Sequence, residues 1–249
     1  MMIDNFNFVE WSDSMAYLTA FLKNRTVQQL VLFTACQNLI WWLVGSTAST
    51  GTPLAWTVKL ALVGYGGLVA AGYFLILRHH FQSTIGPILV VAAATLGLLA
   101  APSEHLIQLF AILLCVFLVL TYVPQLGLQS VYGLIVFSCL AACGVPVILF
   151  LLRNHYLSSQ FLVTLLPIAA SYLALFENYY LLTDRDWRLT LITPAIFAVV
   201  TLSLRFSGTS VVAVLLVAGH WWLQRHLKWH YQLVLTGIVQ LLVVYLILK

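Results

Sequence analysis

Long apolar runs separated by short polar breaks make up most of this sequence. A helix needs about 20 apolar residues to cross the hydrocarbon core of a bilayer. Runs such as 109–120 are continuously apolar, which favours helices over strands of alternating polarity. We therefore predict an all-α fold, a polytopic transmembrane helical bundle. Its expected spans are residues 27–45, 54–77, 85–101, 106–124, 130–152, 160–182, 189–204, 208–224 and 231–248.

Two of these runs, 85–101 and 189–204, are shorter than the others. Either could be a tilted short helix or one half of a re-entrant pair. The pattern therefore predicts eight or nine spans. The breaks between the runs are short and carry Gly, Pro, Ser, Thr or charged residues, which are typical of loops.

The segment before the first span has a different pattern. Its apolar residues recur at helical spacing, with polar residues between them: Trp11, Met15, Leu18 and Leu22. This pattern predicts a short amphipathic helix over residues 8–23 that lies in the membrane interface; packing on other helices or on a partner is the alternative. We divide the chain into an N-terminal interfacial segment, 1–26, and a transmembrane helical domain, 27–249.

The composition excludes a soluble protein with one membrane anchor. Hydrophobic residues make up 62% of the chain and charged residues 7%, whereas soluble domains carry about 25% charged residues. The mean hydropathy is +1.01, and the apolar runs extend along nearly the whole chain. We expect an integral, multi-pass protein of a cell membrane or an organelle inner membrane, with the lipid bilayer as its main partner.

The distribution of Lys and Arg predicts the orientation, because cytoplasmic loops carry an excess of both. In a nine-span chain, most of them fall on the side of the N-terminus: Lys23, Arg25, Arg78, Arg185, Arg188, Arg225 and Lys228. Those on the opposite side are Arg153, Arg205 and Lys249. This distribution predicts an N-terminus on the cytoplasmic side. No basic cluster is large enough to indicate binding to nucleic acid.

Polar residues inside the predicted spans are the candidates for function, because a charge at the bilayer centre costs at least about 2.5 kcal/mol. Three of them are ionisable: Lys59, Glu177 and His220. Three are amides: Gln37, Asn38 and Gln240. We predict that these six line a polar pathway or contact a substrate.

Each candidate also has a more ordinary interpretation. Lys59 is close enough to a helix end for its side chain to reach the interface. Glu177 could face the headgroups or Arg185, and His220, beside Trp221, is typical of an aromatic belt. The amides could form hydrogen bonds between helices, each worth about 0.6 to 2 kcal/mol.

Small residues in the second predicted span indicate close helix packing. Gly67 and Ala71 are four positions apart, and Gly64 precedes them on the same stretch. Small residues at this spacing allow another helix backbone to approach. We predict a helix-packing face here, within the chain or against a partner.

Signatures of enzymes, metals and cofactors are weak. The sequence contains no P-loop, no G-x-S-x-G and no H-E-x-x-H motif. Two histidine pairs, His79-His80 and His226 with His230, have no acidic residue or cysteine beside them. Asp184 and Asp186 alternate with arginines, so a self-neutralised loop is favoured over a Mg²⁺ site. We predict no catalytic residue, no metal and no cofactor.

These observations favour a transport or permeation role for a small solute or ion. The alternative is a non-catalytic subunit of a larger membrane complex, with other membrane subunits or further copies of the chain as partners. A third hypothesis, an intramembrane lipid-modifying enzyme, depends on Glu177, Asp184, Asp186 and the histidines. We rank it lowest.

Overall fold

The computed structural model describes residues 23–47, 53–100, 104–181, 190–227 and 231–249. Every regular element in these residues is helical, which confirms the all-α prediction for the described part of the chain. The α-helices are α2 (Arg25–Gly45), α3 (Trp56–Arg78), α4 (Ile85–Ala100), α5 (His105–Leu120), α6 (Val131–Asn154), α7 (Ser159–Tyr180), α9 (Ile192–Leu204), α10 (Gly208–His226) and α11 (Gln232–Leu248), and a 3₁₀ turn, η1, covers Pro124–Leu126. The predicted interfacial helix at 8–23 lies outside the described residues.

Four helices are long and apolar enough to cross a membrane: α2, α3, α6 and α7. Four others, α4, α5, α9 and α11, are apolar but shorter. These lengths fit an integral membrane protein. The predicted span 106–124 ends earlier than expected, at Leu120. Pro124 explains the difference, because proline disfavours the helical conformation at the residue before it and begins η1 here.

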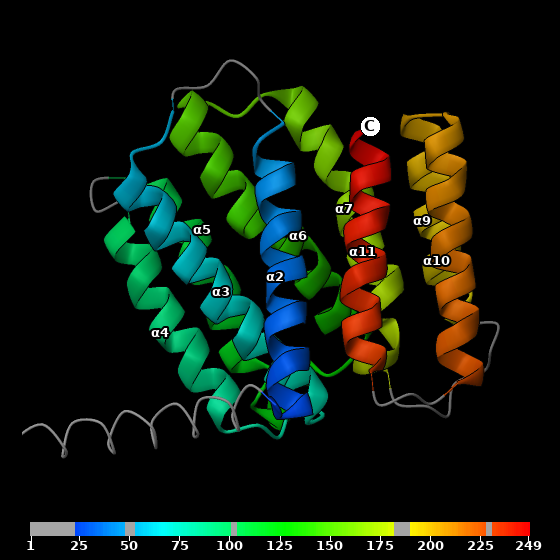
Figure 1. The fold of residues 1–249 in the computed structure, drawn as a ribbon, viewed down its shortest axis with the longest axis horizontal. Coiled ribbons are helices and arrows are strands. Elements are labelled where there is room, and N and C mark those ends of the chain that lie inside the picture. The colour runs from blue at the N-terminus through cyan, green and yellow to red at the C-terminus, as the bar shows by residue number, and fades with distance from the viewer. Residues whose placement is uncertain (1–22, 48–52, 101–103, 182–189, 228–230) are drawn as a thin grey trace, which may run out of the picture.

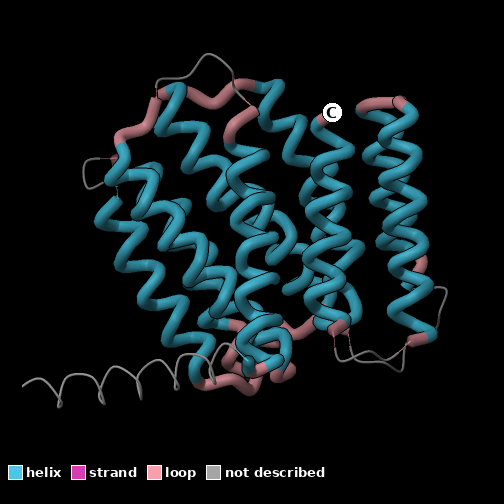
Figure 2. Tube along the Cα trace, viewed as in Figure 1, coloured by secondary structure: helices cyan, strands magenta, loops and turns pink. Residues whose placement is uncertain are grey.

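The helices form two layers, and successive helices run in alternating directions (Figure 1). One layer holds α4, α3, α2, α11 and α10 in that order, and the other holds α5, α6, α7 and α9. The last helix, α11, returns between α2 and α10, so the first and last described helices lie side by side. Figure 2 shows that the loops gather at the two opposite ends of the helices.

Side chains at the helix ends form hydrogen bonds with backbone groups that have no partner within the helix. The Asn24 side chain accepts a hydrogen bond from the Thr26 amide, and Ser158 accepts one from the Phe161 amide. At the far end of α11, the Arg205 guanidinium donates to the carbonyl oxygens of Ile247 and Lys249. The short α9–α10 pair is thereby tied to the end of α11.

The crossing of α3 and α4 depends on two glycines that face each other. A Cβ on Gly72 would lie 2.5 Å from Val90 Cγ2 and 3.0 Å from the carbonyl oxygen of Gly86. A Cβ on Gly86 would lie 2.6 Å from Ile76 Cγ1 and 2.9 Å from the carbonyl oxygen of Gly72. Because these contacts are closer than carbon atoms allow, the two backbones can meet only without side chains at these positions.

We predict that Gly72→Ala destabilises the protein by about 1 to 3 kcal/mol, because the added methyl group forces α3 and α4 apart. The measurement is thermal unfolding of the purified chain in detergent. Gly219→Ala on α10 is the matched control, since an added Cβ there meets nothing within 4 Å. Equal losses of stability in the two variants would contradict the role of the Gly72–Gly86 contact.

Candidate functional site

A line of polar side chains runs along one face of α11. Gln232, Thr236 and Gln240 are spaced four residues apart, which places them on the same face of a helix. Thr236 and Gln240 are fully buried, and Gln232 is partly buried at the start of the helix. Their partners come from α2, α7 and α10, so this polar line lies where four helices meet.

Gln240 takes part in a buried triad with residues of two other helices. Gln37 on α2 donates from Nε2 to Gln240 Oε1 at 2.8 Å. The Tyr172 hydroxyl on α7 donates to Gln37 Oε1, also at 2.8 Å. All three side chains are completely inaccessible to solvent. Gln240 Nε2 has no hydrogen-bond partner among the described residues, so the triad retains one unused donor group.

Aromatic rings surround the triad on the side of α3, α6 and α7. The Phe137 ring lies 6.0 Å from Tyr172 and 5.6 Å from Tyr73, and the Phe176 ring lies 5.7 Å from Tyr172 and 6.5 Å from Phe33. These rings are buried in the core. In such an apolar environment a hydrogen bond is stronger than in water.

Thr236 is the centre of a second polar group, one turn below the triad on α11. Its hydroxyl donates to the backbone oxygen of Gln232 at 2.9 Å and accepts from Gln224 Nε2 at 2.8 Å. His220 Nε2 lies 3.0 Å from the same oxygen, and the Tyr179 hydroxyl lies 3.2 Å away. Residues from α7, α10 and α11 therefore converge on one hydroxyl group.

Gln224 connects this group to the outside. Its Oε1 accepts a hydrogen bond from Asn178 Nδ2 at 2.6 Å, and its Nε2 lies 2.7 Å from His220 Nε2. Asn178 is exposed, Gln224 is partly buried and His220 is buried. His220 Nδ1 has no partner among the described residues. A chain of polar contacts thus extends from the surface to a buried imidazole.

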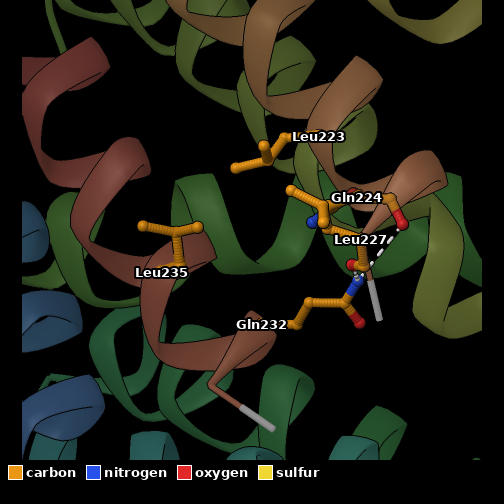
Figure 3. Close-up of a pocket in the computed structure, with 5 residues that line it drawn as sticks. All are labelled: Leu223, Gln224, Leu227, Gln232 and Leu235. Carbon is orange, nitrogen blue, oxygen red and sulfur yellow. Dashed lines mark hydrogen bonds between the residues drawn. The ribbon is translucent and has the colours of Figure 1, made fainter. Parts of the chain in front are cut away.

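A small pocket lies below Gln224, between the end of α10 and the start of α11 (Figure 3). Its volume is about 10 Å³, and Leu223, Leu227 and Leu235 form most of its wall. The Gln232 amide closes it by donating to the backbone oxygens of Gln224 and Leu227, at 3.1 and 2.8 Å. A space of this size holds about one water molecule.

Glu177 lies next to this network on α7 but is directed elsewhere. The residue is buried, and its Oε2 accepts a hydrogen bond from the Thr193 hydroxyl on α9. The loop carboxylates Asp184 and Asp186, on which the enzyme hypothesis depended, lie outside the described residues. Within the part of the chain that the structure describes, no three His, Cys, Asp or Glu residues gather as a metal site would require.

The remaining candidates lie apart from the polar line. Lys59 is partly exposed in the first turns of α3, at the end of the bundle opposite the Thr236 group. Asn38 faces α3, where its Oδ1 fills the space that a Cβ on Gly66 would need. Gly64 and Gly67 are partly exposed, and a Cβ on either would meet only one side chain, at 3.6 Å.

Several residues of the site were not among the predicted candidates. They are Tyr172, Tyr179, Gln224, Gln232 and Thr236. The four-residue spacing of Gln232, Thr236 and Gln240 was a usable signal, because it places three polar groups on one face of an otherwise apolar helix. The tyrosines gave no such signal, since they resemble the aromatic residues of a membrane interface.

Comparisons with known proteins add no relative: no protein-family model, no curated protein and no solved structure matches this chain.

We predict that Gln37 and Gln240 are energetically coupled. Gln37→Leu or Gln240→Leu alone leaves a buried amide without its partner and costs about 1 to 3 kcal/mol. The double variant removes both amides, so its cost falls below the sum of the two by about 1 kcal/mol. Unfolding of the four proteins in mixed detergent measures this difference, and strictly additive losses would show that the two amides do not interact.

Proposed function

We propose that this chain is a multi-pass integral membrane protein with nine spans and an N-terminus on the cytoplasmic side. The alternating helices and the loops at two opposite ends support this topology (Figure 1). The described cations Lys23, Arg25, Arg78 and Arg225 lie at the end of the bundle where α2 begins. Helices shorter than the bilayer is thick are accommodated by local thinning of the bilayer.

We further propose that the chain moves a small solute or ion across the membrane. The observation that carries this proposal is the polar line on α11, Gln232, Thr236 and Gln240, of which the last two are buried, with partners on α2, α7 and α10. Polar side chains inside membrane helices are expensive and commonly mark the pathway of a substrate. Groups one turn apart offer a solute successive hydrogen-bond partners over half the length of the helix.

The other half of the pathway is apolar. Beyond Gln240, α11 buries Val243, Val244 and Ile247, and α2 buries Ile40 and Val44. A solute at the triad can continue only if α2 and α11 separate along this half. The proposal therefore requires two conformations. In one of them the triad is accessible from one side of the membrane, and in the other it is accessible from the opposite side.

The test is flux into proteoliposomes of the purified chain. Glycerol and urea are followed by light scattering, and protons by a trapped pH-sensitive dye. We expect flux above that of empty liposomes for at least one probe. The triple variant Gln37→Leu/Gln240→Leu/Tyr172→Phe should lose this flux while keeping its fold, because all partners of the triad are removed together.

Thr95→Val/Thr164→Val is the matched control. Both hydroxyl groups are exposed and donate only to a backbone oxygen of their own helix, so this variant should retain full flux. Wild-type protein that conducts no probe faster than empty liposomes would contradict the proposal. The same conclusion follows if the triple variant conducts as fast as the wild type.

A second candidate function, a subunit of a larger membrane complex, is favoured by the outer face of α3. Leu60 is 55% exposed, and Gly64, Gly67 and Ala71 continue the same face with partial exposure. The bundle itself does not need small residues at Gly64 and Gly67, since an added Cβ has room at both positions. A helix of another subunit could pack closely there.

Under this second candidate, Gly67→Leu should separate the chain from its assembly without altering its melting temperature. The measurement is the size of the particle after gentle extraction from native membranes. Leu215→Phe, on an exposed position of α10, is the control and should leave the size unchanged. A wild-type chain that is extracted as a single copy would exclude the subunit function.

A further inference from the structure

His220 on α10 is the imidazole that contacts the polar line, through Thr236. The other described polar side chains around Thr236 and Gln240 are the amides of Gln37 and Gln224 and the phenols of Tyr179 and Tyr172. An imidazole changes its charge near neutral pH, whereas a phenol does so at about pH 10. His220 is only 4% exposed, although it lies within hydrogen-bond distance of two polar side chains.

One arrangement of hydrogens for the neutral ring fits the short contacts among His220, Gln224 and Thr236. Thr236 donates its single proton to the backbone oxygen of Gln232, so its oxygen can only accept from other groups. Gln224 Nε2 donates one hydrogen to Thr236 Oγ1. For its second hydrogen, His220 Nε2 at 2.7 Å is a closer acceptor than the Leu175 backbone oxygen at 3.5 Å, and we assign the hydrogen to the ring. In this arrangement Nε2 is an acceptor and the ring proton lies on Nδ1.

A proton added to His220 Nε2 reverses this arrangement. The new N–H donates to Thr236 Oγ1, so Gln224 must turn its carbonyl oxygen toward the ring. The Gln224 amide nitrogen then faces Asn178, which must present its own oxygen. Amide oxygen and nitrogen atoms are nearly identical in size, so the reversal requires rotation of two amides and no change in helix packing.

We propose that His220 is a proton-binding site in this pathway, reached through Asn178 and Gln224. The inference rests on the proposed function, and it specifies the cargo as a proton or as a solute that moves together with one. The exposed Asn178 lies on the side of the bundle that we assign to the cytoplasm. The water-sized pocket below Gln224 lies at the same end, between α10 and α11.

Few charged groups face the imidazole from the neighbouring helices. On α7 the described ionisable residues near it are Glu177, which accepts from Thr193, and Tyr179. The sequence of α9 contains no ionisable residue, and on α11 residues 232–240 contain none. On α10 itself, Arg225 and His226 are exposed beyond Gln224. Protonation therefore adds a positive charge to a largely uncharged interior.

The Nδ1–H is unpaired in both states of the ring, and the positive charge makes its lack of an acceptor more unfavourable. Nδ1 has no described partner, and the imidazolium carries an N–H at both nitrogens. A buried donor without an acceptor is unfavourable. Protonation thus favours a rearrangement that gives Nδ1 an acceptor, which is how a local charge can bias an equilibrium between two conformations.

The first arm of the test observes the ring directly. The full chain, labelled with ¹⁵N-histidine, is reconstituted in phosphatidylcholine bilayers and studied by solid-state NMR from about pH 4 to about pH 8. His220→Gln identifies the resonances. We expect an unprotonated Nε2 at high pH, protonation of both nitrogens on acidification, and a titration midpoint that shifts in Gln224→Leu. His226→Gln, an exposed histidine, is the control.

The second arm measures proton flux with the trapped dye in the same bilayers. We expect His220→Gln to reduce the flux to that of empty liposomes and His226→Gln to leave it unchanged. If the His220 ring does not titrate, or if proton flux survives in His220→Gln, the proton site is overturned. If the ring titrates as expected but the wild type conducts no probe, the proton site stands and the permeation pathway is rejected.

Discussion

The hydrogen bond between Gln37 and Gln240 is the interaction on which the arrangement of the helices most depends. It joins side chains 203 residues apart in the sequence and fixes α2 against α11. In an apolar interior a buried amide needs a partner, and the Tyr172 hydroxyl on α7 supplies a second hydrogen bond to Gln37. The Trp41 indole nitrogen donates a hydrogen bond to the Ala141 backbone oxygen, which links α2 to α6. Four helices are thus held together by polar side chains that would have no hydrogen-bond partner in hydrocarbon.

Different contacts hold the helices together in the two halves of the bundle, around α3 and α4 in the first half and around α7, α10 and α11 in the second. In the first half, α3 and α4 approach until the backbones of Gly72 and Gly86 meet, while hydrogen bonds from Tyr65 and Arg78 join α3 to α5 and α2. In the second half, α7, α10 and α11 are joined by the hydrogen bonds around Thr236. Contacts between backbones are rigid because no side chain can rearrange within them. Hydrogen bonds to amides and an imidazole can exchange donors and acceptors, so mobility and chemistry are expected in the second half.

The sequence predicted the helical fold and the positions of most helices, because apolar runs of spanning length have few alternative structures. It also singled out Gln37, Gln240 and His220, since polar groups in such runs are conspicuous. The sequence did not show that Gln37 and Gln240 are partners. Their contact depends on α11 lying beside α2, and no local sequence pattern indicates that arrangement. Thr236 was missed because a single hydroxyl can bond to its own helix and is common in apolar segments. Tyr172 was missed because its function depends on the direction of its hydroxyl group.

The position of α11 has a consequence for how the protein is made. Chains are synthesised and inserted from the N-terminus, so Gln37 enters the membrane long before Gln240 exists. During that interval the α2 amide is without its final partner, and the centre of the bundle is incomplete. A chain interrupted before residue 240 therefore lacks the α11 partner of the Gln37 amide.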